Sequence, residues 1–318
     1  MCGVNRLLAQ RLVFVGHISV DKVENINGTR VQPGGAALYA AMAARTLFPN
    51  VALISATGKD NKHRDVLNLL PHRDVKIYDA PSTRFHIRYD HRWEAHYLKV
   101  DHGAGSRITS RNISNRWLRQ KSIFHISPMQ PSKVARIVDK IKKKSPEAMV
   151  SVNTWIDYIR KGRKNRRILK DIALKADFFI VNDKEAKALA QTTSISSAVR
   201  LIKAKNLILT LGDLGAIVNG EDADLQLIHA STLPPDKVVD TTGAGDVWCG
   251  AFLAAYNLTE DLAKSISAAS TISRIKCSDW GFQSLIDLRF REPNDVIEFV
   301  MGLKDGGIQK RMLDYMKD

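Results

Sequence analysis

Short apolar runs alternate with longer stretches of helical period along most of the chain. The apolar runs are bounded by turn residues and predict buried strands at residues 12–16, 51–56, 123–127, 148–153, 177–182 and 207–211. Stretches with an apolar stripe predict helices at residues 35–47, 133–144, 166–175, 183–190 and 195–205. Because this alternation favours βα units, we expect an α/β fold with a doubly wound, mostly parallel sheet flanked by helices.

Two segments depart from the alternation. Residues 22–32 contain Asn27-Gly28 between β-compatible residues, which is a strong signal for a two-residue hairpin turn. Residues 84–100 alternate apolar and polar positions on either side of 90–92, with aromatic Phe85, Tyr89, Trp93 and Tyr97. Neither hairpin has a helix partner, so we expect the segments at about 22–33 and 82–100 to form a small β lid over one edge of the core.

The chain length and composition indicate one large folded unit. A chain of 318 residues with 44% hydrophobic positions can bury an extensive core, and nothing marks a linker or repeat, so residues 1–318 are expected to form one domain. The odd set Cys2, Cys249 and Cys277 has no metal-ligand spacing, which favours a reducing compartment. The apolar runs 7–9 and 12–15 are too short for a signal peptide or membrane span, so we expect a cytoplasmic protein without a membrane partner.

The chain is strongly basic, with 48 Lys and Arg against 33 Asp and Glu and a formal charge of +15. Such a charge favours an anionic partner, such as a nucleotide, a nucleic acid or a membrane surface. The densest basic runs, 140–144 and 161–167, lie in or beside amphipathic helices, so solvated helix faces explain them. Nucleic acid is therefore not the partner that we expect.

Residues 240–246, Asp-Thr-Thr-Gly-Ala-Gly-Asp, carry the strongest chemical signal. If Gly243, Ala244 and Gly245 form the first turn of the helix that follows, their N–H groups lack intrahelical acceptors and favour an anion. Such amides would stabilise a phosphoryl group during its transfer. Asp246 would lie beside the same anion and could accept the proton of an attacking hydroxyl. A simple glycine-rich turn would not need a motif of this length.

This motif resembles the C-terminal motif of the ribokinase/PfkB carbohydrate kinases, and the resemblance extends over nearly the whole chain. Residues 16–21 are similar to the exit of the family's first strand, which implies that Asp21 binds substrate hydroxyls. A carboxylate suits this role because its two oxygens can accept from a vicinal diol. Gly34 and Gly35 resemble the family's di-glycine motif, where bare backbone approaches the substrate. The resemblance implies a ribokinase-like fold with a small β lid.

Two further elements resemble the family's nucleotide site. Asn182 and Glu185, three residues apart at a helix start, resemble an Asn-x-x-Glu element that holds the Mg²⁺ ion of the nucleotide. The same spacing also fits a helix capping box, and the family context favours the metal-linked role. The resemblance implies that the nucleotide contacts Asn182, Thr210, Gly212, Gly215 and Thr242.

Two departures from the family bear on the acceptor. Tyr39 replaces an Asn of many ribokinases, and Asn153 replaces an Asp of many members, at positions that lie near the sugar in the family. With the aromatic hairpin, they favour a flatter or less polar acceptor, such as a nucleoside or a cyclic polyol like myo-inositol. Aromatic side chains that merely pack the underside of the lid remain an alternative. A phosphorylated sugar would call for cations near the lid, and Arg84, Arg88 and Arg92 could serve.

The expected activity is ATP-dependent phosphoryl transfer, with Mg²⁺, to a hydroxyl of a sugar, cyclic polyol or nucleoside. Gly58-Lys59 lacks the rest of a Walker A motif, and no Gly-x-Gly-x-x-Gly follows the first strand, so neither of those nucleotide folds is supported. The alternative is a catalytically silent homologue that binds nucleic acid or protein through its basic surface, and the intact Asp246 argues against it. Lid hairpins of this family sometimes pair between subunits, which makes a homodimer through the lid a further expectation.

Overall fold

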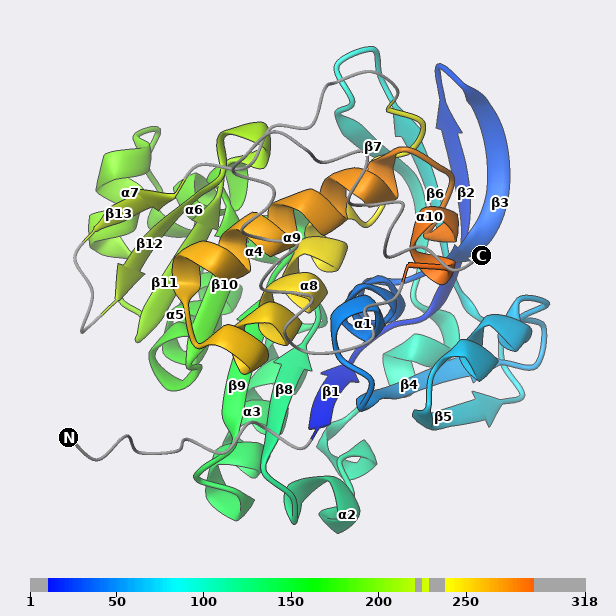
Figure 1. The fold of residues 1–318 in the computed structure, drawn as a ribbon, viewed down its shortest axis with the longest axis horizontal. Coiled ribbons are helices and arrows are strands. Elements are labelled where there is room, and N and C mark those ends of the chain that lie inside the picture. The colour runs from blue at the N-terminus through cyan, green and yellow to red at the C-terminus, as the bar shows by residue number, and fades with distance from the viewer. Residues whose placement is uncertain (1–10, 221–224, 229–237, 289–318) are drawn as a thin grey trace.

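The computed structural model of the protein describes residues 11–220, 225–228 and 238–288, and Cys2 and the apolar run 7–9 lie outside them. Within these residues a nine-stranded sheet in the order β13-β12-β11-β10-β9-β8-β1-β4-β5 crosses the molecule (Figure 1). Its strands are β1 (Arg11–Val15), β4 (Val51–Gly58), β5 (His72–Tyr78), β8 (Ser122–Ile126), β9 (Met149–Asn153), β10 (Phe178–Asn182), β11 (Asn206–Thr210), β12 (Ala216–Gly220) and β13 (Gln226–Ile228). The pairs β11–β12 and β12–β13 are antiparallel and the other pairs among these strands are parallel, so the expected mostly parallel sheet is confirmed.

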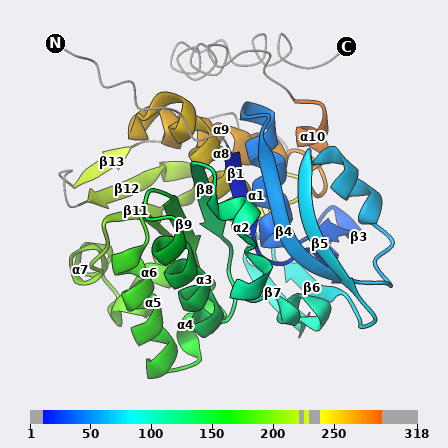
Figure 2. The same cartoon turned by 90° about the horizontal axis from the view of Figure 1, so that it is seen from below.

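The period-two alternation along the strands gives the sheet two apolar faces. On β1, Leu12 and Phe14 join a core with helices α1 (Ala36–Leu47), α8 (Ala244–Thr259) and α9 (Leu262–Cys277). Val13 and Val15 join the opposite core, with helices α3 (Pro131–Lys144), α5 (Arg163–Lys175), α6 (Asp183–Ala190) and α7 (Ile195–Leu201). Figure 2 shows α8 and α9 on one side of the sheet and α3 and α5 on the other. The doubly wound arrangement is therefore confirmed.

The remaining short helices connect these layers. They are η1 (Arg64–Leu69), η2 (Gly103–Arg107), η3 (Ser110–Asn112), α2 (Asn115–Leu118), α4 (Ile156–Arg160), η4 (Gly212–Leu214) and α10 (Gln283–Ile286). No helix among the described residues is long and apolar enough to cross a bilayer.

Helices α1 and α8 approach each other very closely. A Cβ added at Gly250 would lie 1.9 Å from the backbone oxygen of Ala40, so only glycine allows this approach. The many alanines of α1, among them Ala37, Ala41 and Ala44, are fully buried and leave room for α8. This contact sets the position of the start of α8, which carries the motif at 240–246.

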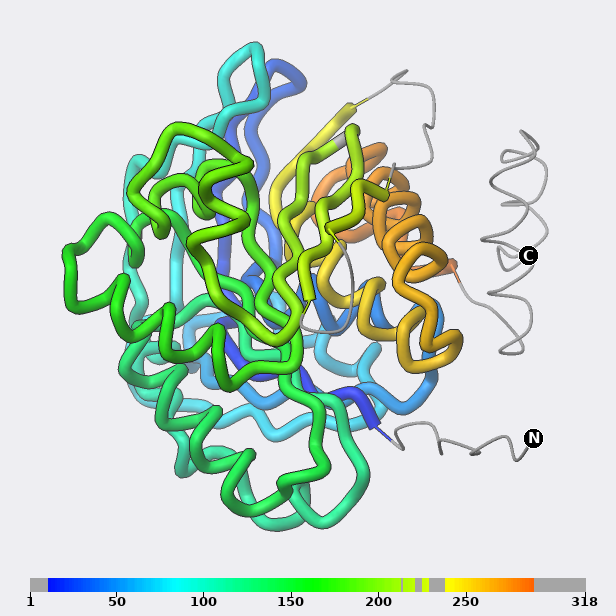
Figure 3. The backbone as a smooth tube through the Cα atoms, turned by 90° about the vertical axis from the view of Figure 1, so that its left-hand side faces the viewer, coloured from blue at the N-terminus to red at the C-terminus, as the bar shows by residue number. Residues whose placement is uncertain are grey.

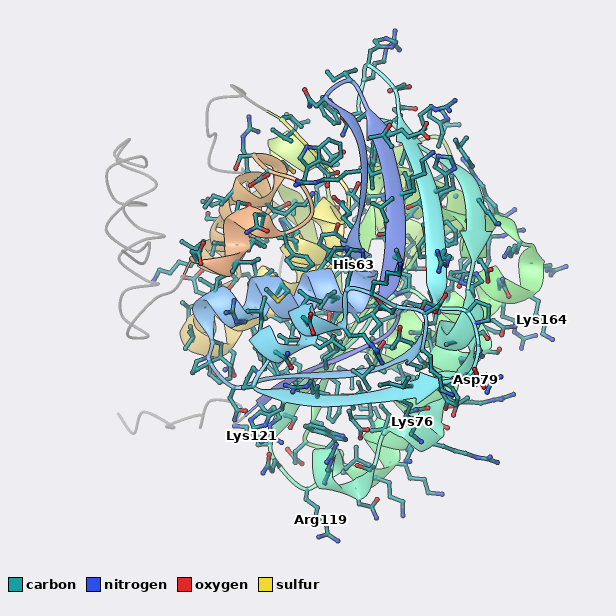
Figure 4. All side chains as sticks on the ribbon, turned by 90° about the vertical axis from the view of Figure 1, so that its right-hand side faces the viewer. His63, Lys76, Asp79, Arg119, Lys121 and Lys164 are labelled. Carbon is teal, nitrogen blue, oxygen red and sulfur yellow. The ribbon has the colours of Figure 1, made fainter. Side chains whose placement is uncertain are left out.

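The basic run at 140–144 follows the polar face of α3. Val134, Ile137 and Ile141 are buried at helical spacing, whereas Lys143 and Lys144 are exposed. Elsewhere on the molecule Lys76, Arg119, Lys121 and Lys164 project outward from different elements (Figure 4). The positive charge is thus spread over the surface of several elements.

A second sheet stands beside the large one. It has the order β3-β2-β6-β7 and consists of β2 (Ser19–Asn25), β3 (Gly28–Gly34), β6 (Thr83–Tyr89) and β7 (Ala95–Asp101). Each hairpin is antiparallel, and the two hairpins join through parallel pairing of β2 with β6. Figure 3 shows the two hairpin ends, blue and cyan, rising side by side at one end of the molecule. Both predicted hairpins are present, and the first begins at Ser19 rather than at 22.

Candidate active site

A cavity of about 400 Å³ lies between the second sheet, the carboxyl ends of β9, β10 and β11, and the start of α8. Ligands of open α/β sheets bind at this edge because the loops after parallel strands meet there. The cavity is lined by most of the predicted site residues: Asp21, Gly35, Tyr39, Asn153, Asn182, Glu185, Thr210, Thr242, Gly243, Ala244, Gly245 and Asp246. Gly34, Gly212 and Gly215 do not line it.

The start of α8 presents backbone amides to the cavity. Gly243 precedes the helix with φ 72°, a left-handed conformation that glycine adopts without strain. Within the described residues, the amides of Gly243 and Gly245 have no protein acceptor, and a Cβ added at Gly245 would meet nothing within 4 Å. The amide of Ala244 differs from our expectation, because it donates to the backbone oxygen of Thr241 at 3.1 Å. The anion-binding turn therefore offers two of the three predicted amides.

Asp246 lies in the first turn of α8, next to these amides. Nδ2 of Asn153 donates to Oδ1 of Asp246 at 3.1 Å. Burial raises the pKa of the Asp246 carboxyl to about 6, and the hydrogen bond from Asn153 opposes the rise. A carboxylate with a pKa in this range is still ionised at neutral pH and is a stronger base than an ordinary aspartate.

Asp21 lies on β2 with only 2% of its surface exposed. Burial, together with the negative charges of Asp240 and Asp246, raises the pKa of the Asp21 carboxyl to about 7. Its Oδ1 atom is buried and has no hydrogen-bond partner within the described residues. Gly34 lies directly against this carboxylate, since an added Cβ would be 1.9 Å from Oδ2. An unpaired carboxylate oxygen at a cavity indicates a site for hydroxyl donors.

Asn182 and Glu185 form a capping box at the start of α6. The Glu185 amide donates to Oδ1 of Asn182 at 2.9 Å, and the Asn182 amide donates to Oε2 of Glu185 at 3.0 Å. Burial, together with the charges of Asp246 and Asp183, raises the pKa of the Glu185 carboxyl to about 8. The capping and cavity-lining roles therefore coexist in the same two side chains.

These carboxylates fit a cation that arrives with a nucleotide. The described residues contain no cluster of three His, Cys, Asp or Glu side chains that would hold a bare metal ion. Mg²⁺ needs no such cluster, because it keeps several waters and binds through substrate phosphates with one or two carboxylates. A positive charge beside Glu185 and Asp246 would offset the burial and the repulsion that raise the pKa of Glu185.

The turn after β11 separates the predicted nucleotide residues. Thr210 ends β11 and lines the cavity, whereas Gly212 and Gly215 begin and follow the short helix η4. A Cβ added at Gly212 would meet nothing within 4 Å. The structure thus brings Thr210, but not the two glycines, to the cavity wall.

Tyr39 supports the turn before α8 from below. Its side chain is only 1% exposed, and a Cβ added at Gly243 would lie 2.4 Å from its ring. Its hydroxyl accepts a hydrogen bond from Nε2 of Gln32 at 3.3 Å. The position that we expected to offer an aromatic face to the acceptor therefore mainly packs beneath the anion-binding turn.

A buried ion pair holds the other end of that turn and was not expected from the sequence. Lys276 on α9 and Asp240 both have fully buried side chains, with Nζ 3.4 Å from Oδ2 and 2.6 Å from the Asp240 backbone oxygen. Oδ2 of Asp240 also accepts from Gln32 and from the amide of Gly281, both at 2.9 Å, and Oδ1 accepts from the amide of Thr242 at 2.8 Å. These bonds fix the backbone just before Gly243.

Aromatic side chains form one wall of the cavity. Tyr97 and Trp155 have ring centroids 4.9 Å apart, and Trp155 and Tyr158 are separated by 5.5 Å. Phe85 meets both Tyr97 and Trp155 edge to face. The sequence indicated the lid members, Phe85 and Tyr97, but not Trp155 and Tyr158. Their position just after β9, at the carboxyl edge of the sheet, is the signal that could have found them. The side chains Phe85, Tyr97, Trp155 and Tyr158 are called the aromatic wall below.

The arginines of β6 face away from the cavity. Arg84 pairs with Asp60 at 2.7 Å, and Arg88 pairs with Glu24 at 2.9 Å. Period-two alternation explains this, since Phe85, Ile87 and Tyr89 line the cavity from the same strand. Arg84, Arg88 and Arg92 are not among the lining residues, so the structure does not bring to the cavity the cations that a phosphorylated acceptor could have used there.

Known proteins are similar to this chain in sequence and in fold. Residues 9–288 match the sequence model of the pfkB family carbohydrate kinases. The cytidine kinase of Thermococcus kodakarensis is 27% identical over 280 residues, which cover 86% of this chain and 98% of that protein. An ATP-dependent 6-phosphofructokinase of Thermoanaerobacterium thermosaccharolyticum is 30% identical over 316 residues, which cover 87% of this chain and 90% of that protein. The structure of ribokinase from Giardia lamblia has a TM-score of 0.74 at 19% identity, covering 90% of this chain and 99% of that one.

The fold is therefore that of the ribokinase-like kinases. The chain belongs to the pfkB family of carbohydrate kinases and is a phosphotransferase with an alcohol group as acceptor. The family and the reaction class expected from the sequence are confirmed, and the comparisons give no support to a catalytically silent homologue.

Proposed function

We propose that this kinase transfers the γ-phosphoryl group of ATP to a hydroxyl of a nucleoside. The observation that carries the proposal is the aromatic wall, because aromatic rings stack on the flat face of a nucleobase. Stacking of this kind contributes about 1–3 kcal/mol per base. A free sugar or a cyclic polyol offers no aromatic face. The similarity to a cytidine kinase supports the same class of acceptor.

In the proposed mechanism the two carboxylates have different tasks. The unpaired oxygen of Asp21 accepts hydrogen bonds from the sugar hydroxyls and orients the acceptor. Asp246 accepts the proton of the hydroxyl that attacks the γ-phosphorus, and the bond between that phosphorus and the bridging oxygen of the nucleotide breaks. The products are the phosphorylated nucleoside and ADP.

The amides of Gly243 and Gly245 stabilise the charge on the phosphoryl group in transfer. They lack protein acceptors and lie at the positive end of α8, next to Asp246. The buried Lys276 and Asp240 hold the preceding backbone in place, so the amides need not reorganise during the reaction. The second sheet forms one side of the cavity, and its closure over the bound acceptor would exclude water, which would otherwise compete as the acceptor.

The nucleotide lies against Thr210, Thr242 and Asn182 in this proposal. Asn182 and Glu185 would hold the water shell of Mg²⁺, which offsets the charge of the nucleotide phosphates when it is bound. Gly212 and Gly215 belong to the turn that follows Thr210 and would contact the nucleotide through their backbone.

The proposal is tested by measuring ATP consumption with nucleosides, ribose and myo-inositol as acceptors. We expect the best nucleoside to exceed ribose and myo-inositol by at least about tenfold in kcat/KM, because only the nucleoside stacks on the aromatic wall. Trp155→Ala should lower kcat/KM for nucleosides by roughly 10–100-fold and leave any ribose activity nearly unchanged. Trp93→Ala, which removes an indole outside the cavity, is the control. A preference for ribose or myo-inositol would contradict the proposal.

A further inference from the structure

A second hollow of about 200 Å³ adjoins the acceptor cavity. The two spaces share His17, His102 and Tyr158, so the hollow opens behind the end of the cavity that carries the aromatic wall. Asp246 and the Gly243 turn do not line it. A group in this hollow would therefore lie at the end of the acceptor remote from the hydroxyl that reacts.

The hollow is lined by cations and has no carboxylate of its own. Lys133 of α3 and Lys161 line it together with two imidazoles, and no Asp or Glu is among the lining residues. Neither lysine forms a salt bridge within the described residues. Nζ of Lys133 donates to the backbone oxygen of Ser106, and Nζ of Lys161 lies 5.4 Å from the ring centroid of Tyr158. Neutral groups thus hold both ammonium groups at the hollow.

The two lysines are close enough to act on His102. Burial lowers the pKa of the His102 imidazole, and the positive charges of Lys161 and Lys133 lower it further. The carboxyl group of Asp101 acts in the opposite direction, and its Oδ1 accepts from the amide of Gly103 at 2.9 Å. The charged side chains that line the hollow are both positive, which favours an anion.

A buried polar atom without a partner belongs to a side chain that lines the same hollow. His17 is only 7% exposed, and its Nδ1 atom has no hydrogen-bond partner within the described residues. Gly105, which also lines the hollow, lies directly against this nitrogen, since an added Cβ would lie 2.2 Å from it. Buried polar atoms are seldom left unpaired, so an orphan beside a cavity indicates a polar ligand group.

We infer that the hollow lined by Lys133, Lys161 and His17 is a subsite for an anionic substituent of the acceptor, a carboxylate or a phosphate. The preferred acceptor then carries its acidic group at the end opposite the reacting hydroxyl. The ammonium groups of the two lysines can donate charge-assisted hydrogen bonds to such a group. The neutral imidazole of His17 can donate a further hydrogen bond. The inference rests on the proposed function, because it names the class of acceptor within the same cavity.

The test compares two matched pairs of acceptors: uridine with 5-carboxyuridine, and fructose with fructose 6-phosphate. We expect the anionic member of at least one pair to exceed its neutral partner by about tenfold or more in kcat/KM, through a lower KM. The pair that responds identifies carboxylate or phosphate as the source of the charge. This preference should weaken as ionic strength rises.

Variants separate the subsite from the reaction site. Lys133→Gln and Lys161→Gln should each reduce the preference for the anionic acceptor by roughly five- to tenfold, with kcat for the neutral acceptor unchanged. Lys164→Gln is the control, because Lys164 does not line the hollow and projects outward (Figure 4). Thermal unfolding of each variant checks that the fold is intact.

Two results would overturn the inference: a preference for the neutral member of both pairs, or equal losses for neutral and anionic acceptors in the lysine variants. Failure of the nucleoside proposal is distinguishable from both. In that case fructose 6-phosphate would be phosphorylated with the expected sensitivity to Lys133→Gln, and neither uridine compound would be an acceptor.

Discussion

Asn153, at the end of the central strand β9, donates a hydrogen bond to Asp246 at the start of helix α8, with 3.1 Å between Nδ2 and Oδ1. This bond joins the sheet to the helix at the point where the anion-binding turn meets the cavity. It orients the Asp246 carboxylate and leaves Oδ2 without a protein donor within the described residues. The free oxygen is the one that can take a proton from the acceptor.

Asp246→Asn should lower kcat by about 10²–10⁴-fold, because the amide cannot accept the proton of the attacking hydroxyl. Binding of the nucleotide should change little, since the backbone amides of the turn remain. Steady-state kinetics and calorimetric titration with ATP check the two parts separately. Asp139→Asn, an exposed aspartate on α3, is the matched control. Full turnover in Asp246→Asn would refute the assignment of the base.

The pH profile of kcat/KM should depend on the same hydrogen bond. The pKa of Asp246 is raised to about 6, so activity should fall as the pH decreases through this value and the base is protonated. The hydrogen bond from Asn153 lowers that pKa. Asn153→Ala should therefore shift the acidic limb of the profile to higher pH by about one unit, because a charge-assisted hydrogen bond contributes ~1.5 kcal/mol. An unchanged limb in the variant would assign it to another group.

Local patterns in the sequence predicted the elements that carry the site. The motif at 240–246, the aromatic hairpin and the strand ends at Asn153 and Asn182 all depend on short-range spacing, and the structure brings them to one cavity. Parallel strands place their carboxyl ends at one edge, so contacts between distant segments followed from the fold class alone.

Other features depend on packing that local spacing does not encode. Nothing in α9 distinguishes Lys276 from a surface lysine, because its burial depends on the approach of Asp240 from another segment. Tyr39 matched a position near the sugar, but the close contact with Gly243 turns its ring beneath the turn. The sequence also did not determine which side chains of β6 face the cavity, because either alternate set of an alternating strand can face inward.

Lys276→Met should lower the free energy of unfolding by about 3–5 kcal/mol, because it leaves the buried charge of Asp240 uncompensated. The turn before α8 should also loosen, so kcat should fall even where the fold persists. Urea denaturation and steady-state kinetics measure these effects. Lys264→Met is the control on the same helix, since Lys264 pairs with Asp261 near the surface at 3.6 Å. Equal stability of the two variants would contradict a structural role for Lys276.

Asp21→Asn should stabilise the protein at alkaline pH while it weakens acceptor binding. The pKa of Asp21 is about 7 in the folded chain and about 3.9 in an unfolded one, so the folded state holds the proton more tightly. The charged carboxylate therefore destabilises the fold increasingly as the pH rises from about 4 to about 7. In urea denaturation at pH 8, the free energy of unfolding of the variant should exceed that of the wild type by a few kcal/mol. At pH 4 the two free energies of unfolding should be equal. Asp79→Asn, at an exposed position (Figure 4), should show no such difference.

An ion pair beside the cavity joins the turn of the lid to the core. Nζ of Lys184 on α6 lies 2.8 Å from Oε1 of Glu94, in the turn between β6 and β7, and both side chains are more than half exposed. Lys184→Ala should raise the KM of the acceptor up to about fivefold, because exposed pairs contribute ~0.2–1 kcal/mol, and it should not change the free energy of unfolding. Adding Glu94→Ala should have no further effect on KM, since the pair is already lost.

The effect of Lys184→Ala should also disappear at high salt, where the ion pair of the wild type is screened. Lys187→Ala is the control, because Lys187 pairs with Asp183 within α6 and does not reach the lid. Additive effects of the two substitutions on KM would show that Lys184 acts on the ligand directly. In that case the lysine would be a binding residue, and closure of the lid would depend on the packing of the aromatic wall instead.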